Sequence, residues 1–162
     1  MSQPRAACLI LAWGNSGRGD DALGLECVAL LRERMPSDWM DRVELLEDHQ
    51  LQIEHVMDLS GRQRVLLIDA STSGHAPFEV SFPTAHRDGS YSSHALTPAA
   101  LLQVFTDVYG YSPPPTTLLA LKGVSFGLGD EVSPQARAHL GAACAWALRW
   151  CEYDDPGEKL CT

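Results

Sequence analysis

Short, continuous apolar runs alternate along this chain with segments in which apolar residues recur every three or four positions. The first run, residues 6–13, ends at Gly14 and predicts a strand that is buried on both faces. Residues 21–35 follow with helical spacing, and Pro36 stops that pattern. The chain is therefore expected to begin with a strand, a loop and a helix.

The middle of the chain continues this alternation with shorter segments. The pattern predicts a short strand over residues 42–46, a buried strand over residues 65–68 and a half-exposed strand over residues 78–82. It also predicts a helix over residues 50–59. The buried face of that helix is expected to comprise Ile53, Val56, Met57 and Leu59.

Two later helices have clear capping signals at their starts. Thr97 and Ser133 each place a hydroxyl at the N-cap, and the proline that follows occupies the first helical position. The apolar pattern continues through Val108 in the first helix and through Ala147 in the second. Between these helices, residues 117–124 are expected to form the last strand.

These elements together predict one fold class. About five strands alternate with about four helices, which favours an α/β fold of three layers, α/β/α, with a largely parallel sheet. The length of 162 residues fits a single domain. We expect its core to span residues 6–150 and a polar tail to occupy residues 152–162.

Composition narrows the classes of partner. The net charge of −9 argues against nucleic acid, because phosphate contacts require a basic face. No apolar run approaches the length of a membrane span, and none has the flanks of a secretory leader, so we expect no membrane partner. The five cysteines form no CxxC pair, which favours a reducing cytoplasm.

The glycine-rich loop after the first strand is the first candidate for a site, because open α/β sheets bind ligands beyond the carboxyl ends of their strands. Residues 14–20 lack both the lysine of a phosphate-binding loop and the GxGxxG spacing of a dinucleotide site. Asp20 and Asp21 at the helix start would repel a phosphate and favour a cation or a backbone amide. We expect Asp20 to cap the helix, whereas Asp21 has either a structural or a functional role.

Two further residues lie where such a site would form. Asp69 directly follows the strand over residues 65–68 and either contributes to the site or caps local amides. His94 lies just before the helix that begins at Pro98. Beside two carboxylates its imidazole would suit a borderline metal such as nickel or zinc, although a lone loop histidine is more often solvated. His55 and His139 are expected at the surface.

The sequence shows none of the familiar protease motifs. It contains no GxSxG elbow, no HExxH segment and no pair of Asp-Thr/Ser-Gly segments. Residue types and spacing alone therefore indicate an α/β protein with a small acidic metal site.

Three segments, in order, resemble signatures of the maturation endopeptidases of nickel-iron hydrogenases. They are LAWGNSGRGDDALG (residues 11–24), VLLIDAS (residues 65–71) and SSHALTP (residues 92–98). The likeness extends from about residue 8 to residue 150. It implies a single cut near the carboxyl end of a hydrogenase large-subunit precursor after nickel insertion, so that the precursor supplies the nickel.

The resemblance also implies roles for particular residues. It places the nickel contacts of the family on Asp21, Asp69 and His94, with an aspartate at position 21 where relatives often have glutamate. Many relatives carry Asp-Gly-Gly-Thr where this chain has DHQLQ, residues 48–52. That variant resembles the branch serving soluble NAD-reducing or bidirectional hydrogenases, and it makes Asp48 and His49 candidates for substrate contact.

Two other functions remain open on the sequence. The same three residues could hold a resident zinc with a water, as in a self-contained metallohydrolase. Alternatively, the chain could sense nickel as a maturation chaperone without cutting any peptide.

Overall fold

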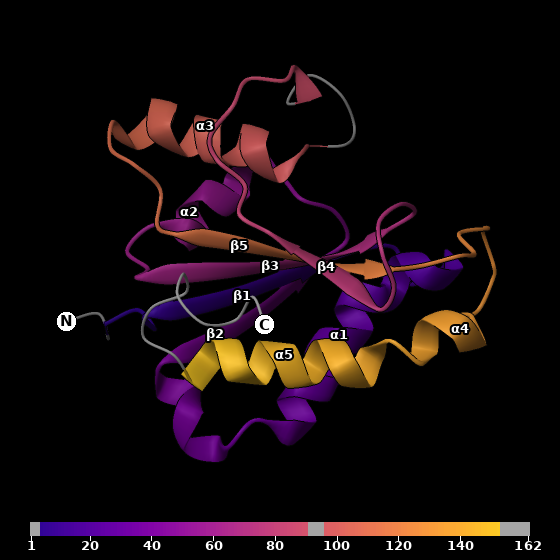
Figure 1. Ribbon diagram of the computed structural model, residues 1–162. Coiled ribbons are helices and arrows are strands. Elements are labelled where there is room, and N and C mark those ends of the chain that lie inside the picture. The colour runs from indigo at the N-terminus through magenta and orange to yellow at the C-terminus, as the bar shows by residue number, and fades with distance from the viewer. Residues whose placement is uncertain (1–3, 91–95, 153–162) are drawn as a thin grey trace.

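The computed structural model describes residues 4–90 and 96–152, which form a five-stranded sheet between two layers of helices (Figure 1). Along the sheet the strand order is β2-β1-β3-β5-β4. The strands are β1 Cys8–Trp13, β2 Val43–Asp48, β3 Arg64–Ser71, β4 Phe78–Ser81 and β5 Thr116–Lys122. Each predicted strand is confirmed to within three residues at either end.

The sheet is parallel except at one edge. β1 pairs in parallel with β2 on one side and with β3 on the other, and β3 pairs in parallel with β5. β4 runs antiparallel to β5, with Phe78 opposite Leu121. A short, half-exposed antiparallel strand closes this edge, as is common in α/β sheets. The predicted three-layer α/β fold is therefore confirmed.

The helices cover the two faces of the sheet unequally. Helices α1 (Leu23–Arg34) and α5 (Leu140–Glu152) lie on one face, and α2 (Val56–Leu59) and α3 (Pro98–Tyr109) lie on the other (Figure 1). Short helices complete the chain: η1 Gly19–Ala22, η2 Ser37–Asp41, η3 Ile53–His55 and α4 Pro134–Arg137. Among the described residues, none of these helices has both the length and the hydrophobicity needed to span a bilayer.

The alternation of side chains in β1 supplies both layers of the core. Ile10 and Ala12 pack with α1 and α5, whereas Leu9 and Leu11 pack with α2 and α3. All four side chains are at most 1% exposed. Successive residues of a strand point to opposite faces, so a strand covered by helices on both sides reads as a continuous apolar run.

The capping predictions hold. The Thr97 hydroxyl accepts a hydrogen bond from the Ala100 amide at 3.1 Å, and the Ser133 hydroxyl accepts one from the Ala136 amide at 3.1 Å. The second helix nevertheless ends after one turn, and the chain enters α5 at Leu140 as a separate helix. Glu152, the first residue of the predicted polar tail, is the last residue of α5, and residues 153–162 lie outside the described residues.

The predicted helix over residues 50–59 is wrong in its start and in its face. The chain forms only the 3₁₀ turn η3 and the single turn α2, after an extended Gln52. Val56 and Leu59 are buried, but Ile53 and Met57 are 43% and 58% exposed. With so little regular helix, a helical wheel does not describe which side chains reach the core.

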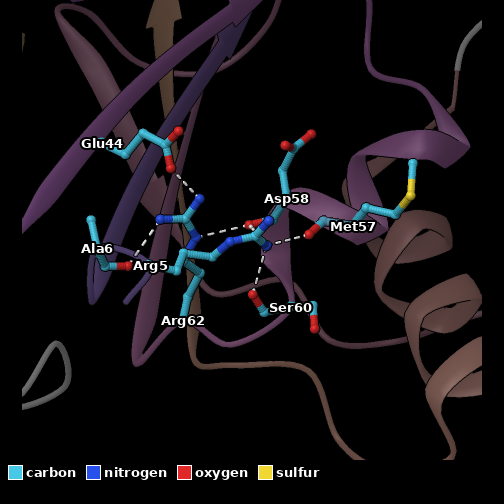
Figure 2. A network of polar contacts seen from close by, with 7 residues as sticks. All are labelled: Arg5, Ala6, Glu44, Met57, Asp58, Ser60 and Arg62. Carbon is cyan, nitrogen blue, oxygen red and sulfur yellow. Dashed lines mark hydrogen bonds and ion pairs between the residues drawn. The ribbon is translucent and has the colours of Figure 1, made fainter. Parts of the chain in front are cut away.

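A network of arginines ties the amino ends of the strands together (Figure 2). The buried Arg62 guanidinium donates to the carbonyls of Ala6 and Asp58, both at 2.9 Å, and pairs with the Glu44 carboxylate. Arg5 donates to the Ser60 carbonyl at 2.8 Å, just beyond the end of α2. Cations are favourable at helix carboxyl ends, where backbone carbonyls lack partners. This network fixes the end of the sheet opposite the cleft described next.

Candidate active site

A cleft of about 600 Å³ opens at the carboxyl ends of β1 and β3. After β1 the chain passes through α1 to β2 on one side, and the next strand, β3, lies on the other side of β1. This reversal of strand order leaves a crevice between the two connections, where ligands of open α/β sheets bind. Asp21, His49 and Asp69 all line the cleft. Three of the predicted site residues are thus brought together.

Asp21 reaches the cleft from the turn η1. One of its carboxylate oxygens accepts a hydrogen bond from the Asn15 amide at 2.7 Å, which holds the side chain against the glycine-rich loop. Gly14 lets the loop backbone lie close to the backbone of Asp21, because a Cβ at position 14 would lie 2.0 Å from the Asp21 carbonyl oxygen. The glycine loop therefore serves to place a carboxylate.

Asp69 enters the cleft from within β3, which extends to Ser71 rather than ending at Ile68 as predicted. Burial, together with the negative charge of Asp21, raises the pKa of its carboxyl to about 7, against hydrogen bonds from the Ala70 amide and the Trp13 side chain that lower it. Desolvation and a like charge both disfavour the ionised form. Near neutral pH this group exchanges a proton readily, which is the behaviour of site carboxylates.

Asp20 does not cap its helix, contrary to the prediction. Its fully buried carboxylate accepts hydrogen bonds from the backbone of Val124, Ser125 and Ser133, at 2.8, 3.0 and 2.6 Å, and from the Ser133 hydroxyl at 2.7 Å. Burial alone would raise its pKa, but these hydrogen bonds outweigh burial and lower the pKa below 3.8. Asp20 is therefore an anchor for the chain after β5, and that chain carries Phe126 to the cleft.

His94 lies outside the described residues, so its predicted place in the site stays a prediction. Leu96 and Thr97, which follow it in the sequence, line the cleft. The Thr97 amide donates to the Ser90 hydroxyl at 3.0 Å, and the Thr97 hydroxyl donates to the Asp88 carboxylate. Hydrogen bonds from Ser90 and Thr97 lower the pKa of Asp88 to about 2. The Asp88 carboxylate is therefore charged at neutral pH, and in that form it holds the start of α3.

Asp48 and His49, the predicted substrate contacts, have different surroundings. His49 is exposed and lines the cleft, whereas the side chain of Asp48 lies beside it in an adjoining hollow of about 220 Å³. Asp48 pairs with His55, whose side chain is only 8% exposed. The prediction that His55 lies at the surface is wrong. His139 is half-buried, and its imidazole lies 2.8 Å from the Lys122 carbonyl oxygen.

Two lining residues escaped the sequence analysis. Arg18 and Phe126 both face the cleft. Arg18 belongs to the same glycine-rich loop as Asp21, so its position in that loop was a usable signal. Phe126 lies on a loop that hydrogen bonds to Asp20, 106 positions earlier, help to hold in place, and no local sequence pattern indicates such a contact.

Side chains with oxygen and nitrogen donor atoms line the cleft. Two carboxylates and an imidazole line one cleft, and such oxygen and nitrogen donors suit a borderline cation. Among residues 4–90 and 96–152, however, no three histidine, cysteine or acidic side chains are grouped closely enough to hold a metal ion.

Comparison with known proteins places the fold. No family model and no curated protein sequence matches the chain. Among solved structures, the NiFe hydrogenase maturation protease HycI from Thermococcus kodakarensis KOD1 is similar with a TM-score of 0.71 and 20% identity, over 90% of this chain and 92% of that chain. The chain has the fold of the hydrogenase maturation proteases.

Further structures agree with this assignment of fold. The hydrogenase maturating endopeptidase HybD from E. coli is similar with a TM-score of 0.70 and 22% identity, over 90% of this chain and 91% of that chain. An endopeptidase from Escherichia coli is similar with a TM-score of 0.67 and 24% identity, over 88% of this chain and 91% of that chain. In each case the agreement spans nearly the whole chain.

Proposed function

We propose that this protein is an endopeptidase that removes the carboxyl-terminal extension of a nickel-iron hydrogenase large-subunit precursor. The observation that carries the proposal is the convergence of Asp21 and Asp69 on one cleft at the switch point of the sheet. Structural neighbours named as hydrogenase maturation proteases share this fold and support the substrate class. The sequence segments around these two residues support the same assignment.

In this proposal the nickel is part of the substrate. Asp21, Asp69 and His94 would contact the ion after it has been inserted into the precursor. His94 is three positions before Thr97 on the cleft wall, and three extended residues span up to about 11 Å, so the chain length permits this role. A cation near Asp69 would favour its charged form and so displace the proton that burial and Asp21 retain there.

Recognition of bound nickel would fix the scissile peptide in the cleft. Holding a peptide bond in a reactive geometry lowers the barrier by up to about 7–11 kcal/mol. The nickel would also polarise a carbonyl or a bound water in contact with it.

Residues 48–52 support a more specific proposal for the class of hydrogenase precursor. The DHQLQ segment supports a precursor of the soluble NAD-reducing or bidirectional hydrogenases. Cys8, Cys27, Cys144 and Cys151 are buried free thiols, which supports a reducing cytoplasm as the place of action.

Cleavage of a nickel-loaded precursor tests the proposal. We expect the intact mass of the precursor to fall by that of its carboxyl-terminal extension when wild-type protein is added. Asp69→Asn should abolish this change, whereas Asp38→Asn, an exposed aspartate outside the cleft, should not. A precursor that is bound without loss of mass would identify a chaperone and contradict the proposal.

A further inference from the structure

The loop after β2 is closed by a single imidazole. The Gln52 amide donates to Nδ1 of His55 at 2.8 Å, and Nε2 of the same ring lies 3.1 Å from a carboxylate oxygen of Asp48. The other carboxylate oxygen of Asp48 accepts from the His49 amide at 2.7 Å. Both ends of the five-residue segment from Asp48 to Gln52 are thereby joined through His55.

The hydrogen bonds define the state of the His55 ring. An amide N–H can only donate, so Nδ1 is the acceptor and carries no proton. The proton of the neutral ring is then on Nε2, from which it is donated to Asp48. The His55 side chain is only 8% exposed, and a buried polar ring is costly unless both nitrogens have partners. Here both nitrogens have partners, so the ring is locked in one orientation.

The middle of the segment is fixed as well. Leu51 is 4% exposed and packs with the apolar layer beneath α2 and α3. At the first residue, the Asp48 carbonyl accepts from the Gly14 amide at 3.2 Å, which joins the segment to the end of β1. Between these two attachments, His49 has a restrained backbone while its exposed side chain faces the cleft that Asp21 and Asp69 also line.

We propose that His55, acting through Asp48, is the positioning residue that fixes His49 on the wall of the cleft, where His49 contacts the backbone of the precursor peptide. The His49 imidazole, when neutral, offers one donor and one acceptor, which match a peptide carbonyl and a peptide N–H. Asp48 then orients the segment and does not itself contact the substrate. This inference rests on the proposed function for the nature of the substrate.

A double-mutant cycle on cleavage tests the coupling. His49→Ala and His55→Leu should each lower kcat/KM by about tenfold, mainly by raising KM, because the first removes the contact with the bound peptide and the second releases the residue that makes it. The double variant should be no worse than His49→Ala alone. His55→Gln, which keeps a donor toward Asp48, should recover part of the loss. His75→Leu, at a histidine whose side chain is 92% exposed outside the cleft, is the matched control and should behave as wild type.

Additive losses in the double variant would overturn the inference, because a merely structural histidine would lower activity equally in the wild-type protein and in His49→Ala. Full activity of His55→Leu would overturn it as well. Amide hydrogen exchange provides a readout that does not depend on cleavage. In His55→Leu, exchange at the His49 and Gln52 amides should accelerate about tenfold or more, and in His55→Gln by less, while the amides of β3 stay protected in both. Unchanged exchange at His49 would also overturn the inference. If wild-type protein cut no precursor, the proposed function would fail, while exchange would still decide whether His55 holds His49.

Discussion

Asp21 and Asp69 lie in one cleft, and the negative charge of Asp21 adds to the effect of burial on the pKa of Asp69. The two residues are 48 positions apart in sequence, one in the turn after β1 and the other in β3. The parallel pairing of β1 with β3 brings them to the same edge of the sheet. Their electrostatic coupling gives the site properties that can be measured without any substrate.

Removal of the charge at Asp69 should change how stability depends on pH. Because the folded-state pKa is about 7 and the ordinary value is 3.8, the folded protein binds more protons than the unfolded chain between these pH values. The contribution of Asp69 to the stability of the wild-type protein should therefore fall as pH rises from about 4 to about 7, by up to roughly 4 kcal/mol. Asp69→Asn should lack this fall and be the more stable protein at pH 8. Urea unfolding of both proteins at pH 4 and pH 8 measures the difference, and parallel pH profiles would contradict the assignment.

Asp21 should influence the titration of its neighbour. Asp21→Asn keeps the size of the side chain but removes the like charge, so the pKa of Asp69 should fall below about 7 while remaining above 3.8, since burial persists. Carbon NMR of the Asp69 carboxyl across a pH series reports this value. Asp38→Asn serves as the control with an exposed aspartate, and an unchanged Asp69 titration in Asp21→Asn would show that the two carboxylates do not interact.

Replacement of Asp20 should lower the free energy of unfolding by more than the loss of a helix cap would. Asp20→Ala leaves the amides of Val124, Ser125 and Ser133 without their acceptor, and hydrogen bonds to a charged group contribute about 1.5–3 kcal/mol each. We expect a loss of at least about 3 kcal/mol at pH 7. Asp130→Ala, which removes two hydrogen bonds from exposed groups of the same loop, should cost about 1 kcal/mol. Equal losses in thermal or urea unfolding would contradict the anchoring role of Asp20.

The sequence predicts the fold because its signals are local. The continuous apolar run in β1 and the Thr97 and Ser133 caps each depend on residues within a few positions of one another, and these elements form as expected. The positions of Asp21 and Asp69 follow from the strand ends and a general rule about parallel sheets. These predictions required no knowledge of long-range contacts.

The errors of the sequence analysis concern residues whose partners are distant or whose local structure is irregular. The role of Asp20 depends on backbone amides more than 100 positions away, which no periodicity indicates. His55 looks like a surface residue because the helical pattern around it is false: the short turns η3 and α2 turn its ring inward to Gln52 and Asp48. In both cases a polar residue is buried because it is fully hydrogen-bonded, and a hydrophobic pattern cannot show that.

The protein alone should bind nickel weakly. The described residues offer two aspartates and one exposed histidine on the cleft, without the compact group of ligands that a tight site requires. Metal analysis after purification should give substoichiometric nickel and zinc. Binding should weaken further below about pH 7, where Asp69 takes up its proton. A full equivalent of tightly bound zinc would instead indicate a self-contained metallohydrolase.

Above all, the protein is expected to recognise the nickel that its substrate holds. The direct measurement is to mix wild-type protein with nickel-loaded and with metal-free precursor and to weigh the products by intact mass spectrometry. We expect the nickel-loaded precursor to lose its carboxyl-terminal extension and the metal-free precursor to keep it, with neither cut by Asp69→Asn. Equal cleavage of the two precursors by the wild-type protein would contradict nickel recognition by Asp21, Asp69 and His94.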